Sequence, residues 1–315
     1  MIDTGLSRHE HWRSWYRLNR YAETLSEEEL HSRFRDIFLN MMSLGKNGLI
    51  GPPNIGLSSS HELLEKFTHI LEEFVIRYGP FPNGLNRQTL HSRPPPDFTS
   101  SLGSRACAAI NANKLNYDQV LVKYGKRIHI ESLREHGAIF LRRASYYAES
   151  SHNDATQDDE LSLKVTPFFS QEAKDALAAH FGLNTPATGR FDFTWNHHGD
   201  YLLFCLCKEV DPRMFIDFNA DACLVITDLQ EFDSRIKTAR VTQCDATFRK
   251  NHVVYVDPLL PQISKVDVPF YKHFRYSYQK EYRYVWQPSH GNGLLNDELV
   301  KIGPLTDISY ILYAD

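Results

Sequence analysis

The sequence lacks the features of secreted and membrane-spanning proteins. It has no apolar run of about 18 residues, so no transmembrane helix is expected, and its first residues contain no apolar signal-peptide core. Cysteine is scarce and odd in number, with five in 315 residues. Three of the five lie in apolar runs typical of buried strands, which argues against a disulfide framework. We expect a reduced, cytoplasmic protein that does not associate with membranes.

An excess of positive charge is also missing. The 35 Lys and Arg residues stand against 39 Asp and Glu, and the net charge of −4 does not favour general binding of duplex nucleic acid. The chain has no P-loop, no G-x-G-x-x-G sequence and no G-x-S-x-G elbow, which argues against three common nucleotide and nucleophile sites. The pairs His197-His198 and Cys205-x-Cys207 lack the partner spacing of a zinc site, so no metal is expected.

What is present is the composition of an ordinary globular protein. Hydrophobic residues make up 42% and charged residues 23% of the chain, and 315 residues suit one large domain or two modest ones. A chain of this length can bury a sizeable core without disulfides or metals.

Residues 1–116 are predicted to be helical. Two capping boxes, at residues 26–29 and 59–62, predict two helix starts, and apolar residues follow each at helical spacing. Gly79-Pro80 ends the second predicted helix, and residues 82–103, rich in Pro, Ser and Asn, are predicted to be a linker. We expect an accessory or regulatory region that could bind a regulatory partner or a second copy of the chain.

Residues 117–315 are predicted to form an α+β domain with a mixed, largely antiparallel sheet. Helices are expected at residues 128–135, closed by a left-handed Gly137, and at residues 170–181, with a short one after Asp228. The predicted strands are residues 120–124, 138–141, 201–207, 222–227, 252–256, 274–286 and 308–313.

Residues 274–286 are the most informative of these segments. Their even-numbered positions are aromatic except for Lys280, and their odd-numbered positions include Arg275, Gln279, Glu281 and Arg283. Because side chains alternate along a strand, the aromatic residues share one face and the polar residues the other. The polar face either lies in solvent or lines a cleft in which the two arginines hold Glu281 ionised.

The Gln279-x-Glu281 pattern resembles the Gln/Glu-x-Glu element of ADP-ribosyltransferases. In that family the Glu binds the nicotinamide ribose and stabilises positive charge at its anomeric carbon, and the residue two before it orients the acceptor. The strand–helix–glycine–strand layout of residues 121–141 is similar too, although Lys123-Tyr124 stands where that family has His or Arg. A Ser-Thr-Ser strand is also missing. The resemblance implies an ADP-ribosyltransferase-like fold with Glu281 and Gln279 as catalytic residues.

NAD would then be the substrate that the domain binds. The same resemblance implies that Lys123, Arg142 and Arg275 bind its phosphates and that Tyr124 or Tyr147 stacks on its nicotinamide. The acceptor of the ADP-ribose would be a protein or a nucleic acid, or water, which would give free ADP-ribose.

Several stretches between about residues 120 and 288 resemble one bacterial family. They are VKYG at 122–125, ASYY at 144–147, DYLLFC at 200–205, DFNADAC at 217–223 and YQKEYR at 278–283. They are similar to uncharacterised proteins related to AbiGi-type abortive-infection proteins. This resemblance implies a bacterial toxic effector in anti-phage defence.

Two other classes of function stay open. In a non-catalytic binding module, the Arg/Glu face of residues 275–283 would be an ion-paired surface. In a metal-dependent nuclease effector, Asp158, Glu160 and Glu281 would hold a metal ion through their carboxylates.

Overall fold

The computed structural model describes residues 7–53, 56–80, 95–113, 119–149, 155–180, 182, 189–262, 265–289 and 295–315. The chain folds into a helical N-terminal part followed by a mostly antiparallel sheet, so the predicted α+β class is confirmed. None of the helices in these ranges combines the length and the apolar character needed to cross a bilayer.

The N-terminal part contains four described helices and one short strand pair. They are α1 (Arg8–Leu18), α2 (Glu27–Asn40), β1 (Ser43–Leu44), β2 (Ile50–Gly51), α3 (Gly56–Tyr78) and α5 (Ser101–Ala112). The capping box at Ser26 is confirmed, because Ser26 and Glu29 bond each other's backbone N–H. Most of the predicted linker, residues 82–94, lies outside the described residues, and its end already belongs to α5.

The second predicted capping box is wrong. Helix α3 begins at Gly56, so Ser59 and Glu62 lie inside it and not at its cap. Glu62 instead accepts a hydrogen bond from Lys66, one turn further on, at 2.7 Å. Gly79 ends this helix with a φ of 86°, as predicted.

An eight-stranded sheet forms the centre of the C-terminal part. Its main path runs β13 (Glu298–Lys301), β4 (Ala138–Arg143), β7 (Leu202–Cys207), β3 (Leu121–Gly125), β8 (Ala222–Ile226) and β14 (Ser309–Tyr313). Besides β4 and β3, strand β7 also pairs with β12 (Glu281–Pro288), which in turn pairs with β9 (Ala246–His252). All of these pairings are antiparallel.

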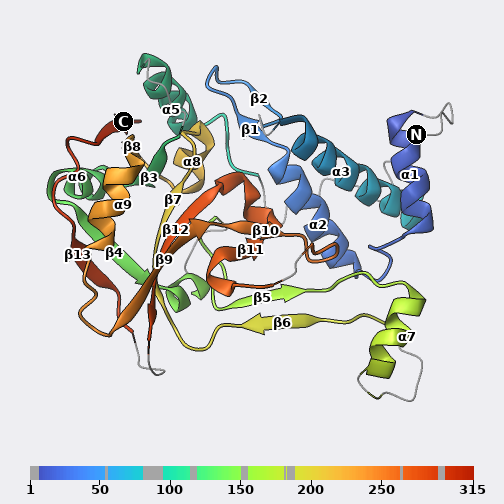
Figure 1. Ribbon diagram of the computed structural model, residues 1–315. Coiled ribbons are helices and arrows are strands. Elements are labelled where there is room, and N and C mark those ends of the chain that lie inside the picture. The colour runs from blue at the N-terminus through green and yellow to red at the C-terminus, as the bar shows by residue number, and fades with distance from the viewer. Residues whose placement is uncertain are drawn as a thin grey trace.

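Helices and smaller strand pairs surround this sheet. The helices are α6 (Arg127–His136), α7 (Gln171–His180), α8 (Pro212–Asp217) and α9 (Leu229–Lys237), with the 3-10 turns η1 (Ala144–Ala148), η2 (Val268–Phe270) and η3 (Phe274–Gln279). The pairs are β5 (Ser162–Val165) with β6 (Phe193–Asn196), and the parallel β10 (Val254–Val256) with β11 (Tyr271–His273). In Figure 1 the strands β5 and β6 run side by side towards α7, below the N-terminal helices.

The sheet divides at β7. Leu202 and Leu203 pair with β4, whereas Cys207 pairs with β3 on the same edge. Between these points the side chain of Lys123 donates a hydrogen bond to the carbonyl of Cys205 at 2.9 Å. Strands β3 and β4 therefore diverge, and a fork opens between them beside β7.

The predicted strand at residues 274–286 is wrong in its first half. Phe274–Gln279 form the 3-10 turn η3, Lys280 adopts a left-handed φ of 47°, and the strand begins only at Glu281. Strand β7 ends at Cys207, opposite Glu281, and β9 ends at His252, opposite Tyr282, so no neighbouring strand in the described chain continues alongside η3.

Asn40 of α2 supplies the hydrogen bonds that a strand partner would have given to η3. Its side-chain amide donates to the carbonyls of Phe274 and Arg275, both at 3.2 Å, and its oxygen accepts from the backbone N–H of Tyr278 at 3.1 Å. Beyond this turn the predicted alternation holds, since Tyr284 and Trp286 both pack in the main apolar core.

Other strand predictions were correct to within a residue or two, at β3, β4, β7, β8 and β14. Gly137 ends α6 with a φ of 60°, as predicted. The predicted strand at residues 252–256 is in fact divided between the end of β9 and β10. Strands β5, β6, β11 and β13 were not predicted.

Buried polar contacts join the helical part to the C-terminal part. The guanidinium of Arg33 in α2 binds the carboxylate of Asp257 through two hydrogen bonds of 2.9 Å. Arg213 of α8 donates to the carbonyls of Leu39 and Met42 at 2.7 and 2.8 Å. Because Arg33, Asp257 and Arg213 are charged and almost fully enclosed, these hydrogen bonds fix α2 against α8 and the segment after β10.

Candidate functional site

Five charged side chains meet beneath the first residues of β12. This buried charge cluster consists of Asp158 and Glu160 from the segment before β5, Lys272 from β11, and Glu281 and Arg283 from β12. The ammonium of Lys272 lies 2.7 Å from a carboxylate oxygen of Glu281 and 3.2 Å from one of Glu160. Asp158 is more distant, at 3.8 Å from the same ammonium.

Arg283 completes the cluster from the opposite side. Its Nε donates to the second carboxylate oxygen of Glu281 at 2.9 Å, and its terminal nitrogens bind both oxygens of Glu160. It also donates to the carbonyl of Pro269 at 2.9 Å. Neither cation is more than 5% exposed, and charges buried this deeply are stable only when paired. Three carboxylates thus face these two cations, and the charge of Arg275 also acts on Asp158.

The pKa values of Glu281 and Asp158 are shifted in opposite directions. Burial alone would raise the pKa of Glu281, but the charges of Arg283 and Lys272 outweigh burial and bring it down to about 2. Burial raises the pKa of Asp158 to about 6, with the attraction of Lys272 opposing and the repulsion of Glu160 adding to this effect. Glu281 is therefore ionised at neutral pH.

Two adjoining cavities open at the fork of the sheet. The first, of about 250 Å³, is lined by Glu281, Gln279 and Lys272 among others, and the second, of about 440 Å³, by Arg142, Phe140 and residues of α6. The two cavities share four lining residues, which are Lys123, Tyr124, Tyr147 and Cys205. The fork between β3 and β4 thus brings the carboxylate of Glu281 and the guanidinium of Arg142 into one composite cleft.

Six of the seven residues that the sequence singled out line this cleft, which are Gln279, Glu281, Lys123, Tyr124, Arg142 and Tyr147. Arg275 does not line either cavity, and its guanidinium donates to the carbonyl of Gln157 at 3.3 Å and to the hydroxyl of Tyr276.

The two tyrosines that were candidates for stacking differ in their surroundings. The ring of Tyr124 packs edge to face on Phe215, and its hydroxyl accepts a hydrogen bond from the backbone N–H of Asp211 at 2.8 Å. Tyr147 is only partly buried and lies where the two cavities adjoin. Tyr147 is therefore the better placed of the two to meet a planar ligand.

The cations of the cleft already have partners. Arg142 pairs with Asp297 and lies between the rings of Phe140 and Tyr146, with its charged carbon 4.2 and 4.3 Å from the ring centres. Burial lowers the pKa of Lys123, whose ammonium lies 4.7 Å from the ring centre of Phe204. An anion that enters the cleft would raise the pKa of this lysine again and favour its charged form.

Sequence reasoning missed Lys272, the cation that holds Glu281. This lysine sits between Tyr271 and His273 in a short segment with no motif, and nothing in the local pattern indicates that it is buried. Its role becomes visible only when β11 is placed beside β10, under the start of β12.

The three carboxylates of the nuclease alternative do come together, but they converge on Lys272 and Arg283 and not on an open cation site. Within the described part of the chain, no group of three or more His, Cys, Asp or Glu side chains has a metal-binding arrangement. Asp154 lies outside the described residues.

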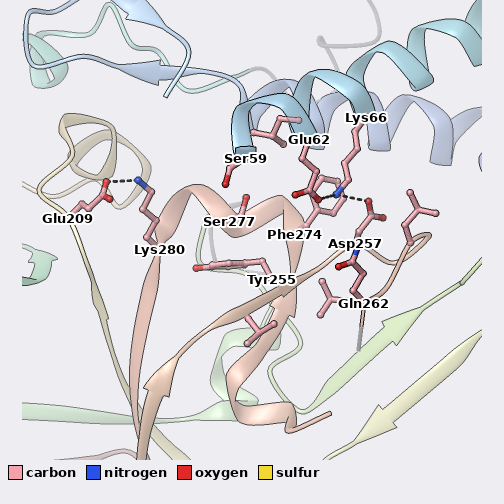
Figure 2. Close-up of a pocket in the computed structure, with 14 residues that line it drawn as sticks. Ser59, Glu62, Lys66, Glu209, Tyr255, Asp257, Gln262, Phe274, Ser277 and Lys280 are labelled. Atoms are coloured by element: carbon pink, nitrogen blue, oxygen red, sulfur yellow. Dashed lines mark hydrogen bonds and ion pairs between the residues drawn. The ribbon is translucent and has the colours of Figure 1, made fainter. Parts of the chain in front are cut away.

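A third and larger cavity, of about 650 Å³, lies between α3 and the turn that precedes Glu281. Figure 2 shows an ion pair near each end of it, Lys280 with Glu209 and Lys66 with Asp257 and Glu62. Tyr255 lines this cavity, and its hydroxyl accepts a hydrogen bond from the backbone N–H of Glu281 at 2.8 Å. The large cavity is therefore linked through Tyr255 to the backbone N–H of Glu281.

No protein-family model, no curated protein and no solved structure matches the chain. Function is therefore inferred from the geometry of the cleft and the chemistry of its residues.

Replacing Glu281 by Gln should lower the free energy of unfolding by about 3 kcal/mol at pH 7, because Lys272 and Arg283 lose a charged partner. The folded-state pKa of Glu281 is about 2 and its ordinary value is 4.5, so its stabilisation is complete above 4.5 and disappears as the pH falls through about 2. Urea denaturation at pH values from 4.5 down to about 2 should show the unfolding free energies of the wild type and the variant becoming equal as the pH falls.

The control is Glu209→Gln, which breaks the more exposed pair with Lys280 and should cost about 1 kcal/mol or less. Equal losses in the two variants would contradict the structural importance of the buried charge cluster.

Proposed function

We propose that the protein is an NAD-using enzyme of the ADP-ribosyltransferase type, which breaks the bond between nicotinamide and ribose. The observation that carries this proposal is the carboxylate of Glu281, which is ionised, fixed by two cations and present in the wall of a cleft with Lys123 and Tyr147. The resemblance of Gln279-x-Glu281 to the Gln/Glu-x-Glu element of that family supports the same function.

The chemistry of the bond explains why this arrangement suits it. As nicotinamide leaves, positive charge develops at the anomeric carbon of the ribose, and a preorganised carboxylate in a dry site stabilises that charge strongly. Lys272 and Arg283 each occupy one oxygen of Glu281. A carboxylate has about four acceptor positions, so a ribose hydroxyl can still bind.

Each of the two cavities would hold a different part of NAD. Nicotinamide and its ribose would occupy the cavity of about 250 Å³, with Tyr147 beside the ring, and the pyrophosphate would reach Lys123 and Arg142 in the cavity of about 440 Å³. Lys123 lines both cavities, which suits a cation that contacts a phosphate at their junction. Arg142 would exchange Asp297 for the phosphate.

An enzyme that consumes NAD would harm the cell that contains it. This consequence fits the toxic effector in bacterial anti-phage defence that the sequence resemblance implies, acting in the cytoplasm. Asn40 of α2 binds the turn before Glu281, which supports a regulatory role for residues 1–116, through a partner or through self-association.

The Glu281→Gln variant keeps the shape of the side chain but removes its charge. We expect the rate of NAD cleavage to fall by about 10²- to 10³-fold, with a much smaller change in NAD affinity, because the lost interaction acts mainly on the transition state. Nicotinamide release measured by chromatography, together with calorimetric titration of NAD, separates the two effects.

The matched control is Asp217→Asn, which breaks the buried pair with Arg213; neither of these two residues lines either cavity. It should destabilise the fold without a comparable loss of rate. If Glu281→Gln cleaves NAD at the wild-type rate, the residue is not catalytic, and absence of cleavage by the wild type would favour a binding module.

Protonation of Asp158 should also affect the rate. Its pKa of about 6 means that the carboxyl is mostly ionised at pH 7, and the buried charge cluster loses this negative charge below that value. The groups that act on it are Lys272, Glu160, Arg275 and Arg283. The rate of NAD cleavage should therefore decrease as the pH falls through about 6.

In Asp158→Asn an uncharged amide replaces this carboxyl at every pH, so the rate should be low and should not change across this range. Profiles of rate against pH between about 5 and 8 test this expectation. The same acid limb in the wild type and in Asp158→Asn would show that another group is responsible.

A further inference from the structure

We infer that the acceptor of the ADP-ribose is water, so that the enzyme releases free ADP-ribose and nicotinamide. This inference rests on the proposed function and specifies its reaction. The first observation is the small space around the reacting centre. Glu281 is 6% exposed, Gln279 is 2% exposed, and the cavity that both line holds about 250 Å³. Nicotinamide and its ribose would take up most of this cavity, which favours a very small acceptor beside them.

The second observation concerns Gln279, the residue that by resemblance would orient the acceptor. Its amide nitrogen donates to the carbonyl of Ala155 at 2.7 Å, and its oxygen lies 3.5 Å from the ammonium of Lys272. The side chain is thus held inside the protein and cannot extend towards a macromolecule at the surface. Its amide oxygen can still accept a hydrogen bond from a water molecule within the cavity.

The third observation excludes the large cavity as a route for a macromolecular acceptor. The residues of the 650 Å³ cavity that lie nearest to Glu281 in sequence are Ser277 and Lys280. The side chain of Glu281 does not line this cavity, and the backbone N–H of Glu281 donates to the hydroxyl of Tyr255, which does line it. A protein or nucleic acid bound there would meet these groups and not the reacting carbon.

The hydrolysis balances without another reactant. The bond from the anomeric carbon to nicotinamide breaks, and its electron pair goes to the ring nitrogen, which removes the positive charge of the pyridinium. The oxygen of water bonds to the anomeric carbon, and one proton leaves to the solvent. Because Glu281 is held as an ion pair, it stabilises the charge on the ribose and does not serve as the base.

The test follows both halves of the substrate, the released nicotinamide and the labelled ADP-ribose. The full chain is incubated with NAD labelled in its adenylate phosphate, in the presence of cell lysate and added nucleic acid. We expect nicotinamide and free ADP-ribose in equal amounts, no label in the acid-precipitated macromolecules, and one labelled oxygen in the ADP-ribose when the reaction runs in oxygen-labelled water. Nicotinamide release with label bound to protein or nucleic acid would overturn this inference alone. No nicotinamide release would overturn the proposed function and this inference together.

A series of small acceptors adds a measure of the space at the reacting centre. Methanol is scarcely larger than water and should compete with it, giving the methyl glycoside of ADP-ribose. Agmatine, a longer guanidino compound, should give no adduct at the same concentration. Transfer to agmatine as readily as to methanol would show that the site admits side chains of macromolecules, and would overturn the inference.

Discussion

The contact on which the site depends is the 2.7 Å ion pair between Lys272 and Glu281. A carboxylate buried this deeply without a cation would lose its charge or would destabilise the fold by several kcal/mol. Arg283 and Glu160 extend the pair into a cluster that ties β11, β12 and the segment before β5 together. These segments are held in one place by charge, and the same charges keep Glu281 ionised where it meets the cleft.

The division of the sheet supplies the space that such a carboxylate needs in order to act. Strand β7 changes partner from β4 to β3, and Lys123 binds the carbonyl of Cys205 at the point of division. The N-terminal helices also help to position the site, although they are far from it in sequence. Asn40 binds η3, and Arg33 binds Asp257. The position of Glu281 therefore depends on packing between parts of the chain more than 200 residues apart.

Sequence reasoning recovered the parts of this arrangement that have a local cause. Apolar runs located β3, β7 and β8, and alternation placed Glu281 and Arg283 on one side of β12, where both lie in the cluster. The same alternation failed over η3, because a turn held by Asn40 of α2 leaves no trace in the local pattern. Lys272 was missed for a similar reason, since its burial follows from three distant segments. The part played by NAD stays a prediction.

A crystal structure with a non-cleavable NAD analogue, in which carbon replaces the ring oxygen of the nicotinamide ribose, tests the central claim most directly. The account predicts that a ribose hydroxyl lies within hydrogen-bond distance of the Glu281 carboxylate, with the pyrophosphate at Lys123 and Arg142. An analogue that binds only in the large cavity beside Tyr255, or that does not bind at saturating concentration, would contradict it.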